Sequence, residues 1–257
     1  MTGVQIPLRR PVPPAGEGWS RYRRSWLVDG IGLTGQARLR AAQVLVVGAG
    51  GLGSPVLLYL AGAGVGRIGV ADFDVVDETN LSRQVVHDQA SVGQPKTASA
   101  RTRLLALDPG LEVVELGRVT TGLLDEQREQ WDLVVECSDT FDTKYLVADW
   151  CEGTGTPLVW GSVVDMVWQV SDFWSRPPAG WPATSLRRLH PRPPAPGQTP
   201  SSTEVGVLGP VVGQAGSAMA TEAVKLVTGV GEPLIGQVLY GDSRRNRYQV
   251  LTYAGTS

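Results

Sequence analysis

The stretch VLVVGAGGLGSP, residues 44–55, decides the fold that we predict for this chain. A short aliphatic run comes first, and Gly48, Gly50 and Gly53 follow it in the spacing G-x-G-x-x-G, with Gly51 as a further glycine. This order predicts a buried strand that turns tightly into a helix. Bare backbone amides at the positive end of a helix dipole suit phosphate oxygens. We therefore predict a nucleotide site here, with a tight turn that binds no ligand as the alternative.

The chain then alternates short β-branched runs with helical segments. The runs predict strands at residues 43–47, 67–72, 111–116, 131–137 and 156–161. The segments between them predict helices at residues 52–63, 95–107, 123–130 and 141–153. This βαβ order is typical of a mainly parallel sheet with helices on both faces, so we expect a Rossmann-like α/β fold.

The remaining segments have patterns of their own. Residues 1–20 are expected to form a flexible Pro-rich arm in front of one domain at residues 21–257. Residues 166–174 predict an additional, antiparallel strand. Residues 175–203 hold eight of the eighteen prolines, which excludes a regular element and predicts a flexible or binding-ordered loop. A long helix at residues 209–229 and a closing hairpin then complete an antiparallel C-terminal extension.

The composition narrows the class of protein. The chain has 257 residues, 42% of them hydrophobic, and a formal net charge of −2 from 23 basic and 25 acidic residues. So small and well mixed a charge gives no case for binding to nucleic acid or anionic lipid. The first twenty residues lack the apolar core of a signal peptide, and no later apolar run reaches the ~18 residues of a membrane span. We expect a cytoplasmic protein.

Two cysteines are too few for a disulfide framework or a four-ligand zinc site. Cys137 lies in an apolar run, and Cys151 lies in a predicted helix. Both are therefore predicted to be buried core residues rather than reactive thiols.

Charged residues after the glycine loop distinguish a triphosphate from a dinucleotide. Asp72 ends the second predicted strand and Asp74 follows it, where a carboxylate reaches ribose hydroxyls in either ligand. Arg83 lies in the next turn, and Lys96 opens the next helix. Two cations there fit a triphosphate, because a cation about 4 Å from a negative charge contributes about 4 kcal/mol at an effective dielectric of about 20 before desolvation. For each charge taken singly, a solvated surface role is the alternative.

A dehydrogenase would need a proton relay near the hydride acceptor rather than two cations. The only histidines, His87 and His190, are not next to a cofactor motif in the sequence. ATP is therefore favoured over NAD. Asp139 follows the fourth predicted strand, at the edge where open α/β sheets bind ligands, and a carboxylate facing polyphosphate most simply binds Mg²⁺. Asp142 is the competing candidate, although it is better placed to cap the following helix.

Six stretches together resemble the ThiF/MoeB/HesA adenylyltransferases, bacterial relatives of ubiquitin-activating enzymes. They are RYRRSW, VLVVGAGGLGSPVLLYLAGAGVG, ADFDVVDETNLSRQVVH, VGQPK, CSDTFDTKYLV and VGVLGPVVGQAGSAMATEAVKLVTG. The resemblance spans about residues 21–253 and implies a homodimeric enzyme. Such an enzyme uses Mg·ATP to adenylate the C-terminal glycine carboxylate of a ubiquitin-like (ThiS/MoaD-like) sulfur carrier that ends in Gly-Gly. Pyrophosphate is released, and the product serves sulfur transfer in cofactor or thio-metabolite biosynthesis.

The resemblance also implies roles for single residues. The nucleotide would be held by Gly48, Gly50, Gly51, Gly53, Asp72, Asp74, Asn80, Arg83, Gln84 and Lys96. Asp139 would sit beside Mg²⁺, and Arg24 would reach into the site of the partner subunit, so Arg24, Arg83, Lys96 and Asp139 would form the catalytic group. The Pro-rich loop would cover the tail of the carrier, like the crossover loop of relatives.

Two departures from the family pattern change what we expect. Ser185 and Arg188 stand where many relatives have the first of two zinc-binding CxxC pairs, so we expect no zinc. Ser202 stands where many relatives have a cysteine that takes up the activated acyl group. A serine hydroxyl ionises far less readily, and no histidine is adjacent in sequence. The reaction is therefore expected to stop at the acyl-adenylate.

Other functions stay open at this point. The acceptor could instead be a ribosomal peptide or a small carboxylic acid in natural-product biosynthesis. A non-catalytic partner that has kept the fold is a second alternative, which the intact set of Arg83, Lys96 and Asp139 disfavours. An NAD-dependent oxidoreductase is the third alternative. Titration with Mg·ATP and with NAD distinguishes it from the other functions, because it would bind NAD more tightly.

Overall fold

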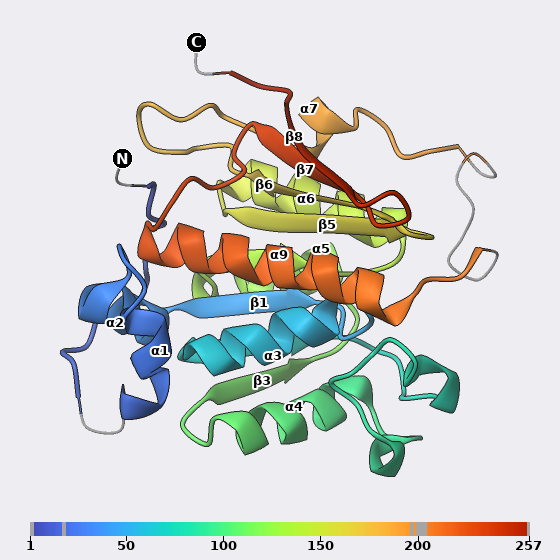
Figure 1. Ribbon diagram of the computed structural model, residues 1–257, viewed down its shortest axis with the longest axis horizontal. Helices are drawn as coiled ribbons and strands as arrows, with labels where there is room; N and C mark the ends of the chain where they lie inside the picture. The colour runs from blue at the N-terminus through green and yellow to red at the C-terminus, as the bar shows by residue number, and fades with distance from the viewer. Residues whose placement is uncertain (1–2, 17–18, 196–197, 199–204, 256–257) are drawn as a thin grey trace.

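The computed structural model describes residues 3–16, 19–195, 198 and 205–255. A single mixed sheet runs through it in the strand order β3-β2-β1-β4-β5-β6-β7-β8 (Figure 1). The strands are β1 (Gln43–Val47), β2 (Arg67–Ala71), β3 (Glu112–Leu116), β4 (Leu133–Glu136), β5 (Leu158–Val164), β6 (Val167–Phe173), β7 (Gln237–Asp242) and β8 (Arg247–Thr252). Strands β1 to β5 pair in parallel, and β6, β7 and β8 pair antiparallel. The predicted Rossmann-like sheet with an antiparallel extension is confirmed.

Helices cover both faces of the sheet. The α-helices are α1 (Arg23–Trp26), α2 (Gly32–Ala41), α3 (Gly53–Ala63), α4 (Lys96–Leu107), α5 (Thr121–Glu126), α6 (Phe141–Thr154), α7 (Leu186–Leu189) and α9 (Gly209–Thr228). Short 3-10 helices are η1 (Trp19–Tyr22), η2 (Glu78–Asn80), η3 (Gln89–Ser91) and η4 (Arg128–Gln130). No helix within the described ranges is both long enough and apolar enough to cross a membrane.

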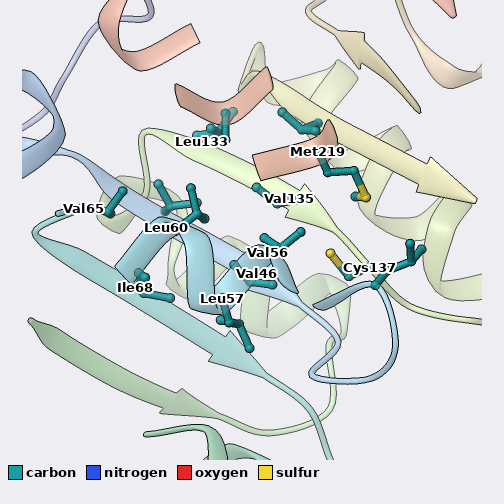
Figure 2. Close-up of a cluster of buried hydrophobic side chains, with 14 of the residues drawn as sticks. Val46, Val56, Leu57, Leu60, Val65, Ile68, Leu133, Val135, Cys137 and Met219 are labelled. Atoms are coloured by element: carbon teal, nitrogen blue, oxygen red, sulfur yellow. The ribbon is translucent and has the colours of Figure 1, made fainter. Parts of the chain in front are cut away.

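The apolar core lies in two layers, one on each face. Alternate residues of β1 point to opposite sides: Val44 and Val46 join the cluster under α3, α4 and α9, and Leu45 and Val47 join the cluster under α5 and α6. Figure 2 shows part of the first layer, where Val56, Leu57 and Leu60 of α3 pack in one cluster with Val46 of β1 and Val135 of β4. Burial on both faces explains why these strands read as continuous aliphatic runs.

The order of the strands fixes where a ligand site belongs. The chain goes outward from β1 through β2 to β3, and then returns to place β4 on the other side of β1. The carboxyl ends of β1 and β4 therefore lead into loops that diverge to opposite faces, which opens a crevice at that edge of the sheet. The glycine loop at residues 48–53 lies at this point.

The amino-terminal segment differs from the flexible arm that the sequence predicts for residues 1–20. The first part of this segment, residues 3–8, is packed: the amide of Ile6 donates to Leu226 O at 2.9 Å, and Val4 and Ile6 are buried in the core, whereas residues 9–12 are exposed. Arg9 forms an ion pair with Glu129. Residues 3–8 have no helix or strand, but Val4 and Ile6 still reach the core and Leu8 packs against it.

The Pro-rich segment at residues 175–203 also contains more structure than the sequence predicts. It includes α7, so the expectation that prolines exclude every regular element is wrong. The amide of Trp174 donates to Thr184 Oγ1 at 2.9 Å, and Leu186 of α7 is buried. The segment Thr184 to Leu189 contains no proline, which leaves room for one helical turn between the Pro-rich stretches.

Candidate nucleotide-binding site

The glycines of the loop serve two different needs. Gly48 has φ of +97°, and a Cβ there would lie 2.9 Å from Cys137 O, while a Cβ on Gly53 would lie 1.9 Å from Gly48 O. These two positions need glycine for the turn itself. A Cβ on Gly50 would meet only Gln84 Nε2, at an ordinary 3.6 Å. Packing therefore does not require glycine at this position, whereas close approach of a ligand to the backbone would.

Asp72 links the loop to the neighbouring strand. It follows β2, and its Oδ2 accepts a hydrogen bond from the amide of Ala49 at 2.8 Å. Its Oδ1 accepts from the amide of Asp74 at 2.9 Å. Each carboxylate oxygen has a second lone pair, so Asp72 holds the loop in place and can still accept from a ribose hydroxyl.

Lys96 and Asp74 are brought together beside Asp72. The ammonium Nζ of Lys96 lies 3.0 Å from Asp74 Oδ2, and the two backbones are also joined because Lys96 N donates to Asp74 O at 2.9 Å. The lysine side chain is buried, whereas half of the aspartate side chain is exposed. Asp74 therefore pairs with the cation in this structure, a partnership that the sequence does not reveal.

The turn at residues 80–84 lies directly beneath the loop. Asn80 Oδ1 accepts from the amide of Asp77 and closes a capping box over η2. Gln84 is buried, and its Oε1 finds no partner among the residues that the structure describes. Arg83 is half-buried, and its Nη1 donates to Thr79 O at 3.2 Å. An acceptor without a partner and a guanidinium with spare donors leave this turn able to bind a further polar group.

His87 is the residue that sequence reasoning missed. The sequence places neither histidine next to a cofactor motif, but in the fold His87 Nε2 lies 3.0 Å from Ala49 O in the glycine loop. His87 Nδ1 lies 2.8 Å from Ser99 Oγ of α4. The ring is buried. Its position after the apolar pair Val85 and Val86 was the only local signal.

Asp139 lies in the turn between β4 and α6 and is exposed. Because Glu136 pairs with Val47 in parallel register, this turn and the glycine loop leave the sheet at the same edge. Asp142 is not the helix cap, since Thr140 Oγ1 accepts from the amide of Thr143 instead. No three His, Cys, Asp or Glu side chains converge as a ready-made metal site within the described part of the chain.

The start of α9 is a further wall of the site that the sequence does not predict. A Cβ on Gly209 would lie 2.5 Å from Ser82 O, so the first turn of this helix packs against the turn at residues 80–84. A Cβ on Gly51 would lie 3.4 Å from both methyl carbons of Val212. Helices α3 and α9 therefore both begin at the glycine loop, as Figure 1 shows.

The ThiF family model matches residues 22–256 of this chain. The chain belongs to the ThiF family. It is 46% identical over 235 residues to a probable adenylyltransferase/sulfurtransferase MoeZ of Mycobacterium tuberculosis, and this match covers 91% of the chain but only 59% of that relative's length. It is 43% identical over 237 residues to the sulfur carrier protein adenylyltransferase of Thermus thermophilus, covering 92% of the chain and 88% of the relative.

The fold is similar to that of a solved structure, E. coli MccB with ATP. The TM-score is 0.78 at 21% identity, over 93% of this chain and 73% of that one. At this identity the likeness concerns the fold alone. It agrees with the sheet and helices described above for this ThiF-family chain.

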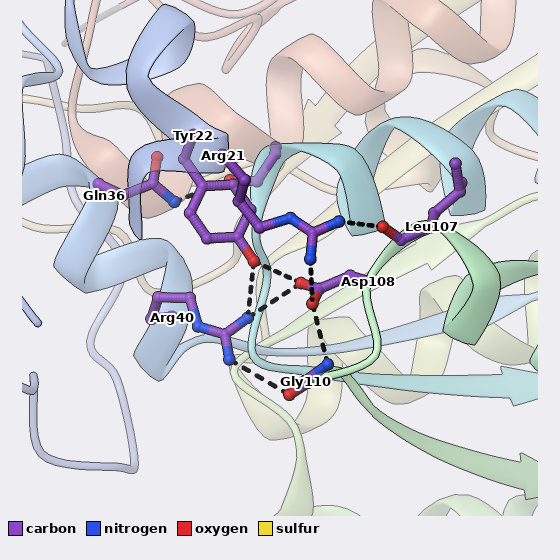
Figure 3. Close-up of polar contacts among 8 residues, drawn as sticks. Arg21, Tyr22, Gln36, Arg40, Leu107, Asp108 and Gly110 are labelled. Carbon is purple, nitrogen blue, oxygen red and sulfur yellow. Dashed lines mark hydrogen bonds and ion pairs between the residues drawn. The ribbon is translucent and has the colours of Figure 1, made fainter. Parts of the chain in front are cut away.

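Arg24 does not join the other candidate residues within one ThiF-family chain. It is exposed on α1, which lies beside α2 at the end of the sheet where β1 begins, while the glycine loop follows the end of β1 (Figure 1). The preceding residues anchor this segment to the C-terminal end of α4. Tyr22 OH donates to Asp108, Arg40 Nη1 lies 3.2 Å from Asp108 Oδ2, and Arg21 contacts Asp108 as well (Figure 3).

A cavity of about 740 Å³ lies beside the carboxyl ends of the parallel strands, where α6 begins, and is lined in part by the Pro-rich segment. Its wall includes Phe141, Lys144, Tyr145, Trp160, Ser162, Val164, Gln169, Leu186, His190, Pro191, Arg192, Pro193, Pro194, Ala195 and Gln198. Lys144 Nζ donates to Glu136 Oε2 and to Gly161 O, each at 2.7 Å. The indole Nε1 of Trp160 is buried and finds no acceptor among the described residues. The lining combines aromatic and proline side chains with the polar residues Ser162, Gln169, Arg192 and Gln198.

The residues that replace the zinc ligands lie in and beside α7. Ser185 precedes this helix and is buried, and Arg188 Nη1 donates to Ala183 O at 2.7 Å. Cys137 and Cys151 are both buried in the core, as predicted, and burial raises the pKa of both thiols. Ser202 lies outside the described residues.

Proposed function

We propose that this chain transfers the adenylyl group of ATP to the C-terminal glycine carboxylate of a ubiquitin-like sulfur-carrier protein and releases pyrophosphate. One observation carries the proposal: at the switch point of the sheet, the buried ammonium of Lys96 lies 3.0 Å from Asp74, whose amide is bonded to the Asp72 that holds the glycine loop. A cation taken out of water needs anionic partners, and phosphate groups supply them. The similarity to the Thermus thermophilus enzyme, named a sulfur carrier protein adenylyltransferase, supports the choice of substrate.

The residues at the loop fit the nucleotide. Gly50 leaves its backbone open to a phosphate, and the start of α3 points its amides into the same space. Gln84 Oε1 lacks a partner among the described residues and would accept from a nucleotide hydroxyl or amine, and Asp72 would accept from the ribose. We place Lys96, Arg83 and Asn80 on the phosphates.

The proposed reaction needs no covalent enzyme intermediate. An oxygen of the acceptor carboxylate attacks the α-phosphorus, the bond from that phosphorus to the bridging oxygen breaks, and pyrophosphate leaves. Catalysis then consists of aligning the carboxylate and stabilising the charge that grows on the phosphates. Lys96 and Arg83 would do this from within the chain.

Asp139 would hold Mg²⁺. A magnesium ion in such sites takes one or two carboxylates and completes its shell with substrate phosphates and water, so a single exposed carboxylate at this edge fits it. When bound, the ion would neutralise charge on the phosphates. We expect no structural zinc, because Ser185 and Arg188 cannot serve as thiolate ligands.

The site would be completed by a second copy of the chain. Within one chain, α1 lies at the opposite end of the sheet from the glycine loop, so Arg24 cannot serve its own site. We propose a homodimer in which Arg24 of the partner subunit contacts the nucleotide phosphates. The Tyr22 and Asp108 contacts would fix the segment that presents this arginine.

The cavity under the Pro-rich segment would take the extended tail of the acceptor. The hydroxyl of Ser162 in its wall suits a carbonyl oxygen of a peptide. Its size also favours a second candidate acceptor, a ribosomal peptide with larger side chains near its C-terminus, because about 740 Å³ exceeds what two glycines fill. The two candidates share the adenylation chemistry and differ only in the acceptor.

Pyrophosphate exchange into ATP tests the proposal. We expect exchange in the presence of a sulfur-carrier protein that ends in Gly-Gly, and none when its last glycine is deleted. Lys96→Ala and Asp139→Ala should abolish exchange, whereas Ser202→Ala should leave it almost unchanged. Titration with NAD is the counter-test, since tighter binding of NAD than of Mg·ATP would contradict the assignment. Exchange only with a peptide acceptor would select the second candidate.

A further inference from the structure

We propose that His87 is a positioning residue: it fixes the glycine loop against the turn of α4 that carries Lys96, and so sets the affinity of the site for the phosphates of ATP. The inference rests on the proposed function, because it assumes that ATP binds at this loop. It adds a residue that neither the glycine motif nor the charged set contains.

Ala49 is the residue of the glycine loop that His87 contacts. Ala49 is fully buried between the first two glycines of the loop. Its N–H donates to Asp72 Oδ2 at 2.8 Å, and its carbonyl oxygen lies 3.0 Å from His87 Nε2. Two side chains from different segments therefore hold one residue from both sides. Because the Ala49 carbonyl and the Gly50 N–H belong to one peptide plane, this fixes the direction in which the Gly50 amide points.

The other ring nitrogen connects the loop to α4. His87 Nδ1 lies 2.8 Å from Ser99 Oγ, and Ser99 is buried three residues after Lys96. Residues three apart lie on the same side of a helix, so the serine and the lysine share one turn. A single imidazole thus connects the glycine loop to the helical turn that carries Lys96. The loop and the lysine would contact the same phosphate chain.

The geometry requires one tautomer. A carbonyl oxygen has no hydrogen to give, so Nε2 must carry the proton, and Nδ1 then accepts from the Ser99 hydroxyl. Burial lowers the pKa of His87, and the charge of Lys96 acts in the same direction, whereas the Ala49 hydrogen bond, Asp72 and Asp88 oppose it. The ring is therefore neutral at pH 7 and adds no charge to the phosphate site.

The test compares two substitutions of the same residue. His87→Leu removes both hydrogen bonds and leaves Ala49 O buried without a partner, and we expect the Kd for Mg·ATP to rise about tenfold or more. His87→Gln keeps a donor that reaches Ala49 O, so it should recover most of the affinity. Titration calorimetry on the full chain measures both, and thermal unfolding of each variant reports separately on the fold.

A matched pair on α4 tests the second contact. Ser99→Ala should weaken Mg·ATP by a few-fold, because the ring loses the partner on its other nitrogen. Thr102→Ala is the control, since the Thr102 hydroxyl donates within the same helix, to Ala98 O, and is exposed. It should leave the Kd unchanged.

The wild-type chain gives a test that needs no variant at the site. It has only two histidines, so nitrogen NMR of the imidazole rings can be assigned with a His190→Gln chain. We expect the His87 ring to be protonated on Nε2, and its signals to shift on addition of Mg·ATP. Protonation on Nδ1 alone would overturn the proposed role of His87, because Nε2 could then not donate to Ala49 O.

The outcomes separate this inference from the proposed function. A wild-type chain that binds no Mg·ATP overturns the proposed function and the role of His87 in affinity together. Wild-type binding with an unchanged Kd in His87→Leu overturns the role of His87 alone. A loss in His87→Leu that His87→Gln does not restore overturns it as well, because the donor to Ala49 O would then be irrelevant.

Discussion

Lys96 and Asp74 form an ion pair in which only the lysine is buried, with Nζ 3.0 Å from Oδ2 and side-chain exposures of 7% and 51%. The cation has lost most of its water and depends on Asp74, whereas the aspartate remains largely hydrated. An incoming phosphate could therefore displace the aspartate at small cost, since Asp74 would return to water. The pair holds the ammonium in position before the nucleotide arrives.

Removing the charge of Lys96 should weaken nucleotide binding strongly and spare the fold. We expect Lys96→Met to raise the Kd for Mg·ATP about a hundredfold, which is less than the bare Coulomb attraction because desolvation offsets part of it. The thermal midpoint should change little, because the stranded Asp74 is exposed. Calorimetry checks the first point and thermal unfolding the second. Arg103→Met, which removes an exposed cation further along α4, is the control and should bind as the wild type does.

If each subunit contributes Arg24 to the site of its partner, two inactive variants should restore activity when they are mixed. Neither an Arg24→Ala chain nor a Lys96→Ala chain should support pyrophosphate exchange alone. After subunits are mixed and allowed to exchange, one site of each mixed dimer has both residues intact, so activity should recover to about a quarter of the wild-type level or less under random assortment. Arg23→Ala, which changes the neighbouring exposed arginine, should be active alone. Full activity of Arg24→Ala by itself would exclude this role.

Tyr22 should make the stability of the chain depend on alkaline pH. Burial, and then the hydrogen bond to Asp108, raises the pKa of Tyr22 from 10 to about 12. The folded chain therefore holds this proton more tightly than the unfolded chain. The free energy of unfolding must decrease as the pH rises through that interval, and the contribution is complete below pH 10.

The Tyr22→Phe variant isolates this effect. We expect it to lose about 1–3 kcal/mol at pH 7, since the hydroxyl bonds a buried carboxylate. The loss should shrink as the pH approaches 12. Burial also raises the pKa of Tyr253 to about 12, so Tyr253 titrates in the same interval. Because both the wild-type chain and the Tyr22→Phe chain contain Tyr253, the difference between their free energies of unfolding reports on Tyr22. Urea unfolding at several pH values measures it, and a constant difference across the range would contradict the assignment.

Much of the fold follows from local patterns in the sequence. Strands such as β1 are aliphatic runs because both of their faces are covered, and α9 ends at Gly229, whose φ of +78° is the left-handed cap that the glycine predicts. The candidate site is predicted as far as residue types allow: the loop, Asp72, Gln84 and Lys96 do lie together. Arg24 is recognised only through the family resemblance, because one chain leaves it far from the loop.

The rest depends on contacts between distant segments. His87 and Ala49 are 38 positions apart, and the acceptor is a backbone carbonyl, which has no signature in the sequence. The ion pair between Asp74 and Lys96, 22 positions apart, likewise has no signature in the sequence. The burial of Val4 and Ile6 in the amino-terminal segment is not apparent from the sequence, because it depends on contacts with distant residues such as Leu226.

Glu136 and Lys144 form a buried ion pair at the end of β4, beneath the turn that contains Asp139. Glu136 ends β4 and is fully buried, its Oε2 2.7 Å from Lys144 Nζ, and its Oε1 accepts from the amide of Ser138 at 2.8 Å. A buried charge without its partner is costly, so Glu136→Gln and Lys144→Met should each lower the free energy of unfolding by about 3–5 kcal/mol.

The double variant should lose much less than the sum of these two changes. With both charges gone, no ion is left uncompensated, and the remaining cost is the unpaired carbonyl of Gly161 and the altered packing beside Trp160. Urea unfolding of the four chains at pH 7 gives the coupling energy directly. A coupling near zero would mean that solvent reaches the pair and that each charge is stabilised without the other.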